Sequence, residues 1–383
     1  MSEHEQLLNK LIRTKSLSGH EEEIRTFIGD WFKERGISSE VIDENLIVHL
    51  EGVDKTKAFI FNSHMDTVGP GEKGWKQIDP WKPTPDGNKL RGLGATDMKS
   101  GLTASMLLAE QIHSSGKPPV DMWFTYVVKE EVDGSGSEKF AKWFSKNGYT
   151  RKYKDMAAIF TEATNLKAVE HGHRGNFFLE VTAKGKSGHA SRPDIYVGKT
   201  PVRKIIEFSD ELQKEVVNWK EEFKDTYFDP SITVGEMTSL KANVKSESGK
   251  VVADSPNKIA DVCTATFDLR TTPKAHDMLF KRVKELAKRM NVTVKNLYPP
   301  APAGFTDPSE KIVKVVSSIV KNSKIEVTLG SADLGFLAAQ GIKGIIFGPG
   351  VKLQEHKTNE YTYPAQIPQA VEIYKQIVEA WAK

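Results

Sequence analysis

An imidazole and a carboxylate stand together where an apolar segment ends. His64 and Asp66 follow residues 58–61, which are all apolar and suit a buried strand. Side chains two residues apart on a strand point the same way, so both would project from one strand end. A histidine that binds a metal is commonly oriented by a neighbouring carboxylate. The pair therefore predicts a metal ligand and its support, with a buried, hydrogen-bonded histidine as the alternative.

Three acidic residues follow His64 at nearly equal spacing. Asp97, Glu131 and Glu162 come at successive intervals of 33, 34 and 31 residues. A strand-helix-strand unit takes about 30 residues, and the carboxyl ends of parallel strands lie along one edge of a sheet. Taken singly, Asp97 suits a helix cap, and Glu131 beside Glu130 suits a solvated strand end. The shared spacing favours a cluster at one sheet edge.

A late histidine completes a set of metal-ligand types. The candidate ligands are His64, Asp97, Glu131, Glu162 and His356. Two imidazoles and three carboxylates exceed the needs of one tetrahedral zinc ion and suit two ions about 3.5–4 Å apart that share a carboxylate. Zinc is the favoured metal, with cobalt and manganese as alternatives. Glu130, next to Glu131, is the candidate general base for such a centre.

Alternating strand and helix patterns must position these residues. Helical apolar spacing covers residues 3–14 and 103–113, while residues 41–50, 120–128 and 156–160 read as strands. Ser18 and Glu21 have capping-box spacing and predict a second helix that runs to about residue 34. Residues 69–91 are rich in Gly, Pro and Trp and predict a long functional loop. We therefore expect an α/β domain around the ligands.

A second pattern begins near residue 176. Its expected elements run in the order β-α-β-β-α-β, which is the ferredoxin-like arrangement. The strands cover 176–184, 231–240, 259–271 and 292–297, and the helices 198–222 and 273–290. The chain then returns to an α/β pattern. The predicted division is 1–174 and 298–383 for the first domain and 175–297 for the inserted one.

Composition excludes several classes of function. The 383 residues are 38% hydrophobic and 27% charged, as in ordinary soluble proteins. The net charge of +3 comes without the basic and aromatic cluster that nucleic-acid binding requires. Cys263 is the sole cysteine, the first residues are polar, and no apolar run approaches about 20 residues. We expect a cytoplasmic protein without nucleic-acid or membrane partners.

Several short motifs resemble those of a known family. They read SHMDTV (63–68), GATDMKSG (94–101), KEEVDGSG (129–136), TEAT (161–164), GHAS (188–191) and EHKTNE (355–360). Together they resemble the dizinc amidohydrolases related to acetylornithine deacetylase, succinyl-diaminopimelate desuccinylase, aminoacylase and glutamate carboxypeptidase. The resemblance implies a zinc-peptidase-like catalytic domain, a mixed sheet flanked by helices, with an inserted ferredoxin-like α+β lid and dimerisation domain. It also implies a homodimer formed through that lid.

The resemblance assigns a role to each candidate ligand. Asp97 would bridge two metal ions, most simply zinc. His64 and Glu162 would complete the ligands of one ion, and Glu131 and His356 those of the other.

The resemblance also assigns the catalytic groups. A metal-bridging hydroxide would attack the substrate, with Glu130 as general base and Asp66 orienting His64. A cis peptide bond is expected after Asp97.

The substrate-side residues are also implied by the resemblance. His189 would reach the neighbouring subunit's site and stabilise the oxyanion. Arg270 and Asn257 would contact the substrate's α-carboxylate, with a surface ion pair as the alternative for Arg270. Arg174 and the pair Gly330-Ser331 match further contact positions.

The expected reaction is hydrolysis of the amide bond of an N-acyl amino acid. Glu162 is a glutamate, as in the deacylase and carboxypeptidase branches of the family it resembles, while dipeptidase and tripeptidase relatives usually have aspartate. Three family motifs differ here: Glu-Pro-Thr is Glu-Ala-Thr at 162–164, Asn-Val-Ile-Pro is Asn-Lys-Ile-Ala at 257–260, and Gly-Thr-Asp-Ala-Arg is Gly-Ser-Ala-Asp-Leu at 330–334. The substrate-side departures leave the acyl group open. A dipeptidase or carboxypeptidase is the alternative enzyme, and a non-catalytic binding protein the alternative from another class.

Overall fold

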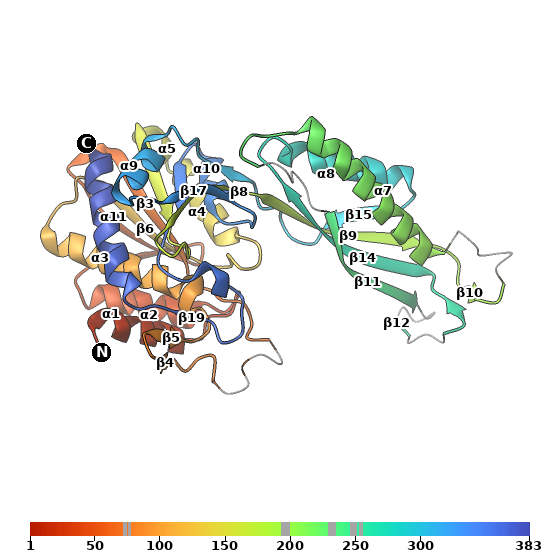
Figure 1. Cartoon of the computed structure of the whole chain (residues 1–383), viewed down its shortest axis with the longest axis horizontal. Helices are drawn as coiled ribbons and strands as arrows, with labels where there is room; N and C mark the ends of the chain where they lie inside the picture. The colour runs from red at the N-terminus through yellow and green to blue at the C-terminus, as the bar shows by residue number, and fades with distance from the viewer. Residues whose placement is uncertain (72–74, 76–77, 193–199, 229–234, 246–250, 253–255) are drawn as a thin grey trace. The chain divides into compact units, whose positions relative to one another are not determined.

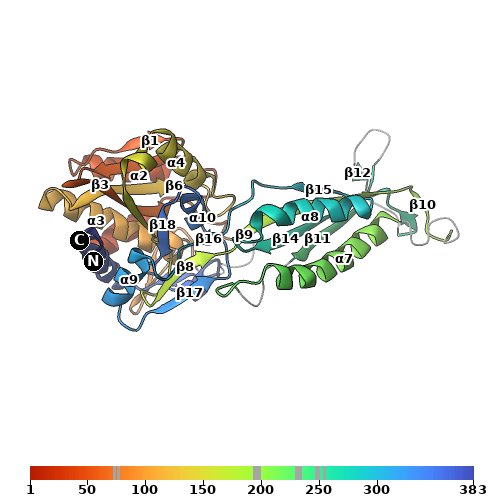
Figure 2. The same cartoon turned by 90° about the horizontal axis from the view of Figure 1, so that it is seen from above.

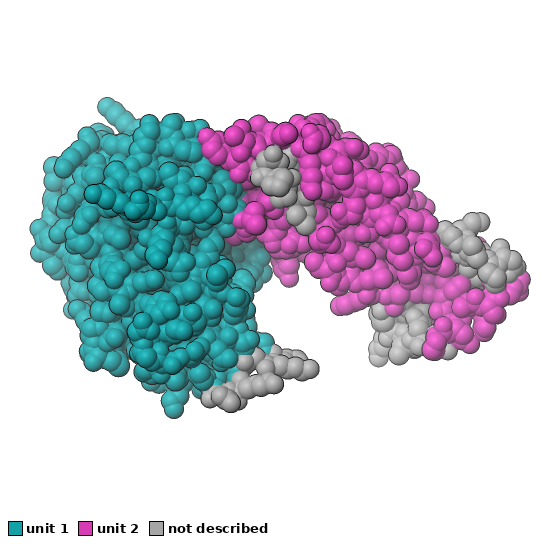
Figure 3. Space-filling model, in the orientation of Figure 1, with its two compact units in different colours: residues 1–173, 304–328, 332–383 teal, residues 174–303, 329–331 magenta. Residues whose placement is uncertain are grey.

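Two compact units make up the chain (Figure 3). The computed structural model describes every residue except 72–74, 76–77, 193–199, 229–234, 246–250 and 253–255. The first unit comprises Met1–His173, Gly304–Thr328 and Ala332–Lys383, and the second Arg174–Ala303 and Leu329–Ser331. The predicted domain boundaries, and the role of the inserted segment as a lid, stay predictions.

A mixed sheet forms the centre of the first unit (Figures 1 and 2). In the described residues its nine strands run in the order β1-β2-β6-β3-β7-β18-β8-β16, with β17 also paired to β8. β3 (Asp54–His64) lies between β6 (Val120–Val127) and β7 (Asp155–Phe160) and is parallel to both. β18 (Lys343–Ile346) is parallel to β7 on its far side. The mixed sheet flanked by helices is the predicted fold class.

Both edges of this sheet differ from the prediction. Residues 41–50 form a hairpin, β1 (Glu40–Ile42) and β2 (Asn45–Leu50), because Asp43 and Glu44 turn the chain with φ of 48° and 75°. At the other edge, β8 (Ala168–His173) has no counterpart in the prediction. It pairs with β17 (Lys324–Thr328) and β16 (Gly304–Phe305).

Helices cover both faces of the sheet. One face bears α1 (Glu3–Arg13), α2 (Glu22–Lys33), α3 (Ser100–Ser115), α9 (Lys311–Ile319) and α11 (Gln366–Ala382). The other bears α4 (Ser135–Lys146), α5 (Tyr149–Lys152) and α10 (Leu334–Ala338). Phe59, Phe61 and Phe124 point to the first face, while Trp123 packs on Phe144 and Tyr149 on the second. Among the helices of the described ranges, none is long and apolar enough to cross a membrane.

The predicted loop 69–91 contains a hairpin that a later segment joins. β4 (Thr84–Asp86) pairs with β5 (Lys89–Arg91), and β5 pairs with β19 (Tyr361–Thr362). A 3-10 turn, η2 (Lys352–Gln354), and residues 355–360 precede β19, and η1 (Ala95–Lys99) follows β5 closely. Pairing of β5 with β19 therefore brings the segments of Asp97 and His356 to one place.

The second unit packs two helices on one face of a sheet (Figure 2). Its main elements are β9 (Gly175–Lys184), α7 (Pro201–Glu222), β11 (Gly235–Lys245), β14 (Val262–Thr271), α8 (His276–Arg289) and β15 (Thr293–Asn296). This is the predicted β-α-β-β-α-β order, and the sheet runs β12 (Val251–Val252), β11, β14, β9, β15. β10 (Gly188–His189) pairs separately with β13 (Lys258–Ile259). The predicted helix start at 198–199 and strand start at 231–234 lie outside the described residues.

Candidate metal centre

The ends of three neighbouring strands carry most of the predicted ligands. β3 ends at His64, and the chain continues from β6 to Glu131 and from β7 to Glu162. These strands are adjacent and parallel, so their carboxyl ends meet at one edge of the sheet. Asp97 differs, because it lies in the turn before α3 and not at a strand end. The expectation that the equal spacing puts all four residues at strand ends is therefore wrong for Asp97. A cap on α3 is also wrong, because that helix begins at Ser100.

The structure brings the five predicted ligands into one cluster. His64 Nε2 lies 3.1 Å from Asp97 Oδ1 and 3.5 Å from Glu162 Oε1. The other carboxylate oxygen of Asp97 lies 3.3 Å from His356 Nε2, which is 2.7 Å from Glu131 Oε2. Asp97 thus presents one oxygen to each histidine, which is the arrangement expected of a carboxylate shared by two ions.

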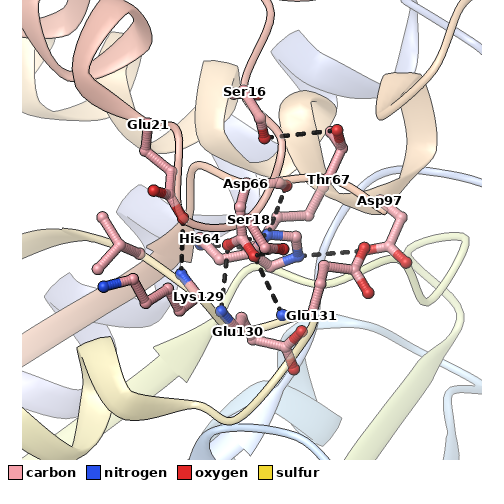
Figure 4. Close-up of polar contacts among 12 residues, drawn as sticks. Ser16, Ser18, Glu21, His64, Asp66, Thr67, Asp97, Lys129, Glu130 and Glu131 are labelled. Carbon is pink, nitrogen blue, oxygen red and sulfur yellow. Dashed lines mark hydrogen bonds and ion pairs between the residues drawn. The ribbon is translucent and has the colours of Figure 1, made fainter. Parts of the chain in front are cut away.

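Asp66 contacts His64 and the backbone of Glu130 and Glu131 (Figure 4). Its backbone carbonyl accepts a hydrogen bond from His64 Nδ1 at 3.0 Å, and its buried carboxylate lies 3.4 Å from the same nitrogen. It also accepts hydrogen bonds from the Ser18 hydroxyl at 2.6 Å and from the backbone N–H groups of Glu130 and Glu131 at 3.1 and 3.2 Å. Asp66 therefore orients the His64 ring through its carbonyl and its carboxylate, and the same carboxylate fixes the backbone that carries both glutamates.

The predicted capping box is wrong, and its residues support the site instead. The Ser18 hydroxyl bonds to Asp66, 48 residues away. Glu21 precedes α2 but makes no side-chain cap; its carboxylate accepts from the N–H groups of Gly19 at 2.8 Å and Lys129 at 3.1 Å. The spacing of Ser18 and Glu21 correctly indicates a polar turn. Both side chains, however, bond to distant segments instead of forming a local cap.

The two adjacent glutamates have different surroundings. The Glu131 carboxylate bonds to His356 Nε2 at 2.7 Å. Among the residues that the structure describes, none donates a hydrogen bond to the Glu130 carboxylate, and the charged groups that act on it are led by Asp333. Glu131 is thus engaged within the cluster, while Glu130 keeps oxygens available for a proton.

Asp333 is a site neighbour that the sequence did not single out. It lies just before α10, is buried, and accepts a 2.6 Å hydrogen bond from the Ser137 hydroxyl. Burial raises its pKa to about 7. An acidic side chain at the beginning of an apolar segment is the signal that the sequence offers for it.

Burial and neighbouring charges shift the pKa values of several groups in the cluster. Burial raises the pKa of Glu162 well above its usual value, and Asp97 raises it further. Burial opposes protonation of His64, but Glu162, Asp66 and Asp97 outweigh it and raise the pKa of that ring. Hydrogen bonds to Asp97 and Glu131 raise the pKa of His356 to about 11. Buried carboxylates that repel one another form an arrangement that a multiply charged cation stabilises.

The donor set fits a pair of divalent cations. One ligand atom each from His64, Asp97 and Glu131 lies within 4.8 Å of the others. Glu162 and His356 add a carboxylate and an imidazole at the two ends of the group. Nitrogen and carboxylate donors are those that zinc and related ions accept. The predicted cis peptide bond between Asp97 and Met98 is confirmed.

The predicted substrate-side residues all belong to the second unit. There, Asn257 Nδ2 lies 3.3 Å from His189 Nε2, and the Ser191 hydroxyl lies 2.7 Å from His189 Nδ1. β10 and β13 create this arrangement, because His189 and Lys258 are paired across the two strands. The predicted oxyanion histidine and the predicted carboxylate contact are therefore neighbours.

The two predicted arginines also lie near each other. Arg270 Nη2 donates to Asp268 Oδ2 at 2.8 Å, which is the ion pair considered as its alternative. Arg174 is buried, and burial together with the charge of Arg270 lowers its pKa. Its backbone N–H donates to Gly330 O at 3.0 Å, and the buried hydroxyl of Ser331 has no hydrogen-bond partner among the described residues. The binding roles of all four stay predictions.

Substitution of Asp66 by asparagine is expected to weaken metal binding by roughly 10–100-fold, because the amide cannot support His64 as a carboxylate does. Titration of metal-free protein with Co²⁺, followed by visible absorption, measures this.

Asp121→Asn is the matched control. Asp121 is equally buried and accepts from Gly52 N–H and the Tyr153 hydroxyl, but it lies at the beginning of β6, the end opposite to the cluster. Equal Co²⁺ affinity in both variants would contradict the role of Asp66.

Comparison with known proteins agrees with this geometry. The sequence signature of peptidase family M20/M25/M40 matches residues 60–380. A Staphylococcus epidermidis protein described as a probable succinyl-diaminopimelate desuccinylase is 24% identical over 407 residues, covering 98% of this chain and 96% of its own. These matches confirm the resemblance seen in the motifs.

Solved structures share the fold. An M20 family metallo-carboxypeptidase from Sulfolobus solfataricus superposes with a TM-score of 0.76 at 15% identity, over 100% of both chains. A dinuclear metal-binding M20 peptidase from Bacillus subtilis gives 0.68 at 14%, over 98% of this chain and 96% of its own. The predicted zinc-peptidase-like α/β fold is confirmed.

Proposed function

Because the chain belongs to peptidase family M20/M25/M40 and is a metallohydrolase, we propose that it hydrolyses the amide bond of an N-acyl amino acid. The proposed ligands of two divalent ions, most simply zinc, are His64, Asp97, Glu131, Glu162 and His356. Reactions of the acetylornithine deacetylase and succinyl-diaminopimelate desuccinylase type are the favoured ones. A cytoplasmic homodimer formed through the second unit is part of the proposal.

The contrast between Glu130 and Glu131 carries this proposal. A hydrolase needs a base beside its ligands as well as the ligands themselves. Glu131 is bonded to His356, while Glu130, on the same stretch of backbone held by Asp66, has no donor among the described residues. A protein that only stored or bound metal would have no use for this second, unengaged carboxylate.

The protein groups divide the chemistry among them. Two bound ions would supply Lewis acidity to the amide carbonyl and acidify a water molecule. Glu130 takes the proton of the attacking water and delivers it to the leaving amine nitrogen. His189 of the neighbouring subunit would donate a hydrogen bond to the developing oxyanion.

The second unit supports a substrate that carries a carboxylate. Arg174 and Arg270 are close enough for each charge to act on the other, and a bound carboxylate would offset that repulsion. Asn257 would add a hydrogen bond to the same group. An α-carboxylate is common to N-acyl amino acids and to the C-terminal residue of a peptide, so this feature fits both candidate activities.

A dipeptidase or carboxypeptidase activity is the alternative. The S. solfataricus structure of the same fold is described as a metallo-carboxypeptidase. The relative described as a probable desuccinylase favours the deacylase, and the glutamate at position 162 favours it over the dipeptidase.

A substrate panel separates the two activities. The protein is loaded with Zn²⁺ or Co²⁺ and given N-acetyl and N-succinyl amino acids beside unblocked dipeptides and N-blocked peptides. We expect the highest kcat/KM on an N-acyl amino acid, because the relative described as a probable succinyl-diaminopimelate desuccinylase favours deacylation. Faster cleavage of the dipeptides would replace the deacylase by the dipeptidase, and faster cleavage of the N-blocked peptides would replace it by the carboxypeptidase.

A further inference from the structure

We infer that Glu360 is a positioning residue that fixes the backbone of Asp97 and thereby sets the geometry of the metal centre. The inference rests on the metal site proposed above, but not on which amide is the substrate. Glu360 lies four residues after His356 and directly before β19.

The Glu360 carboxylate receives three backbone N–H groups from one turn. Oε2 accepts from Gly94 at 2.8 Å, and Oε1 accepts from Thr96 at 2.6 Å and from Asp97 itself at 3.0 Å. The side chain is 1% exposed. Backbone N–H groups that converge on a buried carboxylate form strong, charge-assisted hydrogen bonds. The orientation of the Asp97 peptide is therefore tied directly to Glu360.

Further bonds keep Glu360 itself in place. Its own backbone carbonyl accepts from Gly92 N–H at 3.0 Å. The next residue, Tyr361, pairs with Arg91 in β5, and its carbonyl accepts from the Thr96 hydroxyl at 3.0 Å. Glu360 is thus held at the beginning of β19, and its carboxylate can fix the position of the turn at residues 94–97.

This arrangement couples the two halves of the centre. His356 approaches Asp97 Oδ2 at 3.3 Å, and His64 approaches Oδ1 at 3.1 Å. Glu360 belongs to the same loop as His356 and binds the backbone of the carboxylate that His356 faces. A shift of this turn would move Asp97 relative to both histidines. Because a ligand shared by two ions has to suit both at once, such a shift would disturb both halves of the centre.

Three substitutions give a graded test, and Co²⁺ binding to the whole chain is the readout. Glu360→Gln keeps an oxygen for Thr96 and Asp97 but turns an amide toward Gly94 N–H. Glu360→Asp is one methylene too short, and Glu360→Ala leaves three buried donors without an acceptor. We expect Co²⁺ affinity to fall by roughly 10–100-fold in the aspartate and alanine variants and by less in the glutamine variant.

The Asp121→Asn control distinguishes a loss of the positioning role from a general loss of stability, because it removes another buried carboxylate that accepts a hydrogen bond from a backbone N–H. All variants are compared at a temperature where circular dichroism shows each to be folded. The visible spectrum of bound Co²⁺ should change in the Glu360 variants and stay unchanged in Asp121→Asn. If Glu360→Ala unfolds, the aspartate and glutamine variants decide.

The outcome separates this inference from the proposed function. Wild-type affinity and spectrum in the Glu360 variants would overturn the positioning role, even if the wild type hydrolyses N-acyl amino acids. Weakened binding in the same variants would support it, even if the wild type cleaves only peptides. A wild type that binds no Co²⁺ would overturn both this inference and the proposed metal site.

Discussion

Glu130→Gln is expected to lower kcat by roughly 10²–10⁴-fold, which is the usual contribution of a general base. The amide keeps the shape of the side chain but has no lone pair basic enough to take a proton from water. Metal binding should be unchanged, because the ligands and the Asp66 contact with the backbone N–H of Glu130 remain. Steady-state kinetics and metal analysis on the same preparation check both parts.

The matched control for Glu130 is Glu138→Gln on α4. Glu138 ion-pairs with Lys142 on the exposed side of the helix and should leave kcat within error of the wild type. Near wild-type turnover in Glu130→Gln would remove Glu130 from the reaction. Loss of metal in that variant would mean that Glu130 is a ligand and not a base.

Asp97→Asn is expected to abolish most activity by disabling the shared ligand. An asparagine presents one oxygen and one N–H₂ group, so only one side of the centre retains its acceptor. Two ions contribute several kcal/mol of transition-state stabilisation, so a fall in kcat/KM of at least about 10²–10³-fold is expected. Metal content should drop from two ions per chain to one or none.

Asp54→Asn serves as the control for Asp97, since the Asp54 carboxylate lies at the beginning of β3, where it accepts hydrogen bonds from the neighbouring Thr56 and lies 3.9 Å from Lys57 Nζ. Retention of two ions and of full activity in Asp97→Asn would contradict the bridging role. Mass spectrometry of metals, together with the melting temperature, separates loss of a ligand from loss of the fold.

The strand ends that carry the cluster could be predicted from the sequence because their signals are local. An apolar run followed by His64, or by Glu130 and Glu131, marks a buried strand and its polar end without knowledge of the rest of the chain. Parallel order then places those ends together. No spacing rule relates His356 to these strands, so only its residue type and the motif EHKTNE indicate it.

Contacts between distant segments could not be predicted. Ser18 and Glu21 have the spacing of a local cap, yet their partners are Asp66 and Lys129, which the packing of the N-terminal turn brings to them. Glu360 had no visible role, because its acceptor function depends on the pairing of β19 with β5.

Strand β8 was missed because polar residues interrupt its pattern. Glu170, His171 and His173 are buried, which an apolar count does not anticipate. Each has a partner from a later segment: Lys352 for Glu170, the Thr306 carbonyl for His171 and the Gly335 N–H for His173. Buried polar groups of this kind are stabilised only by tertiary hydrogen bonds, and those bonds are invisible in the local sequence.

The most direct test of the account is a titration of activity against bound metal. Metal-free protein is prepared with a chelator, and Zn²⁺ or Co²⁺ is added in steps while turnover of the best N-acyl amino acid and metal content are measured together. We expect no turnover without metal and a return of activity that reaches its maximum at two ions per chain. Full turnover by the metal-free protein, or activity that reaches its maximum before any ion is bound, would contradict the metal-dependent reaction.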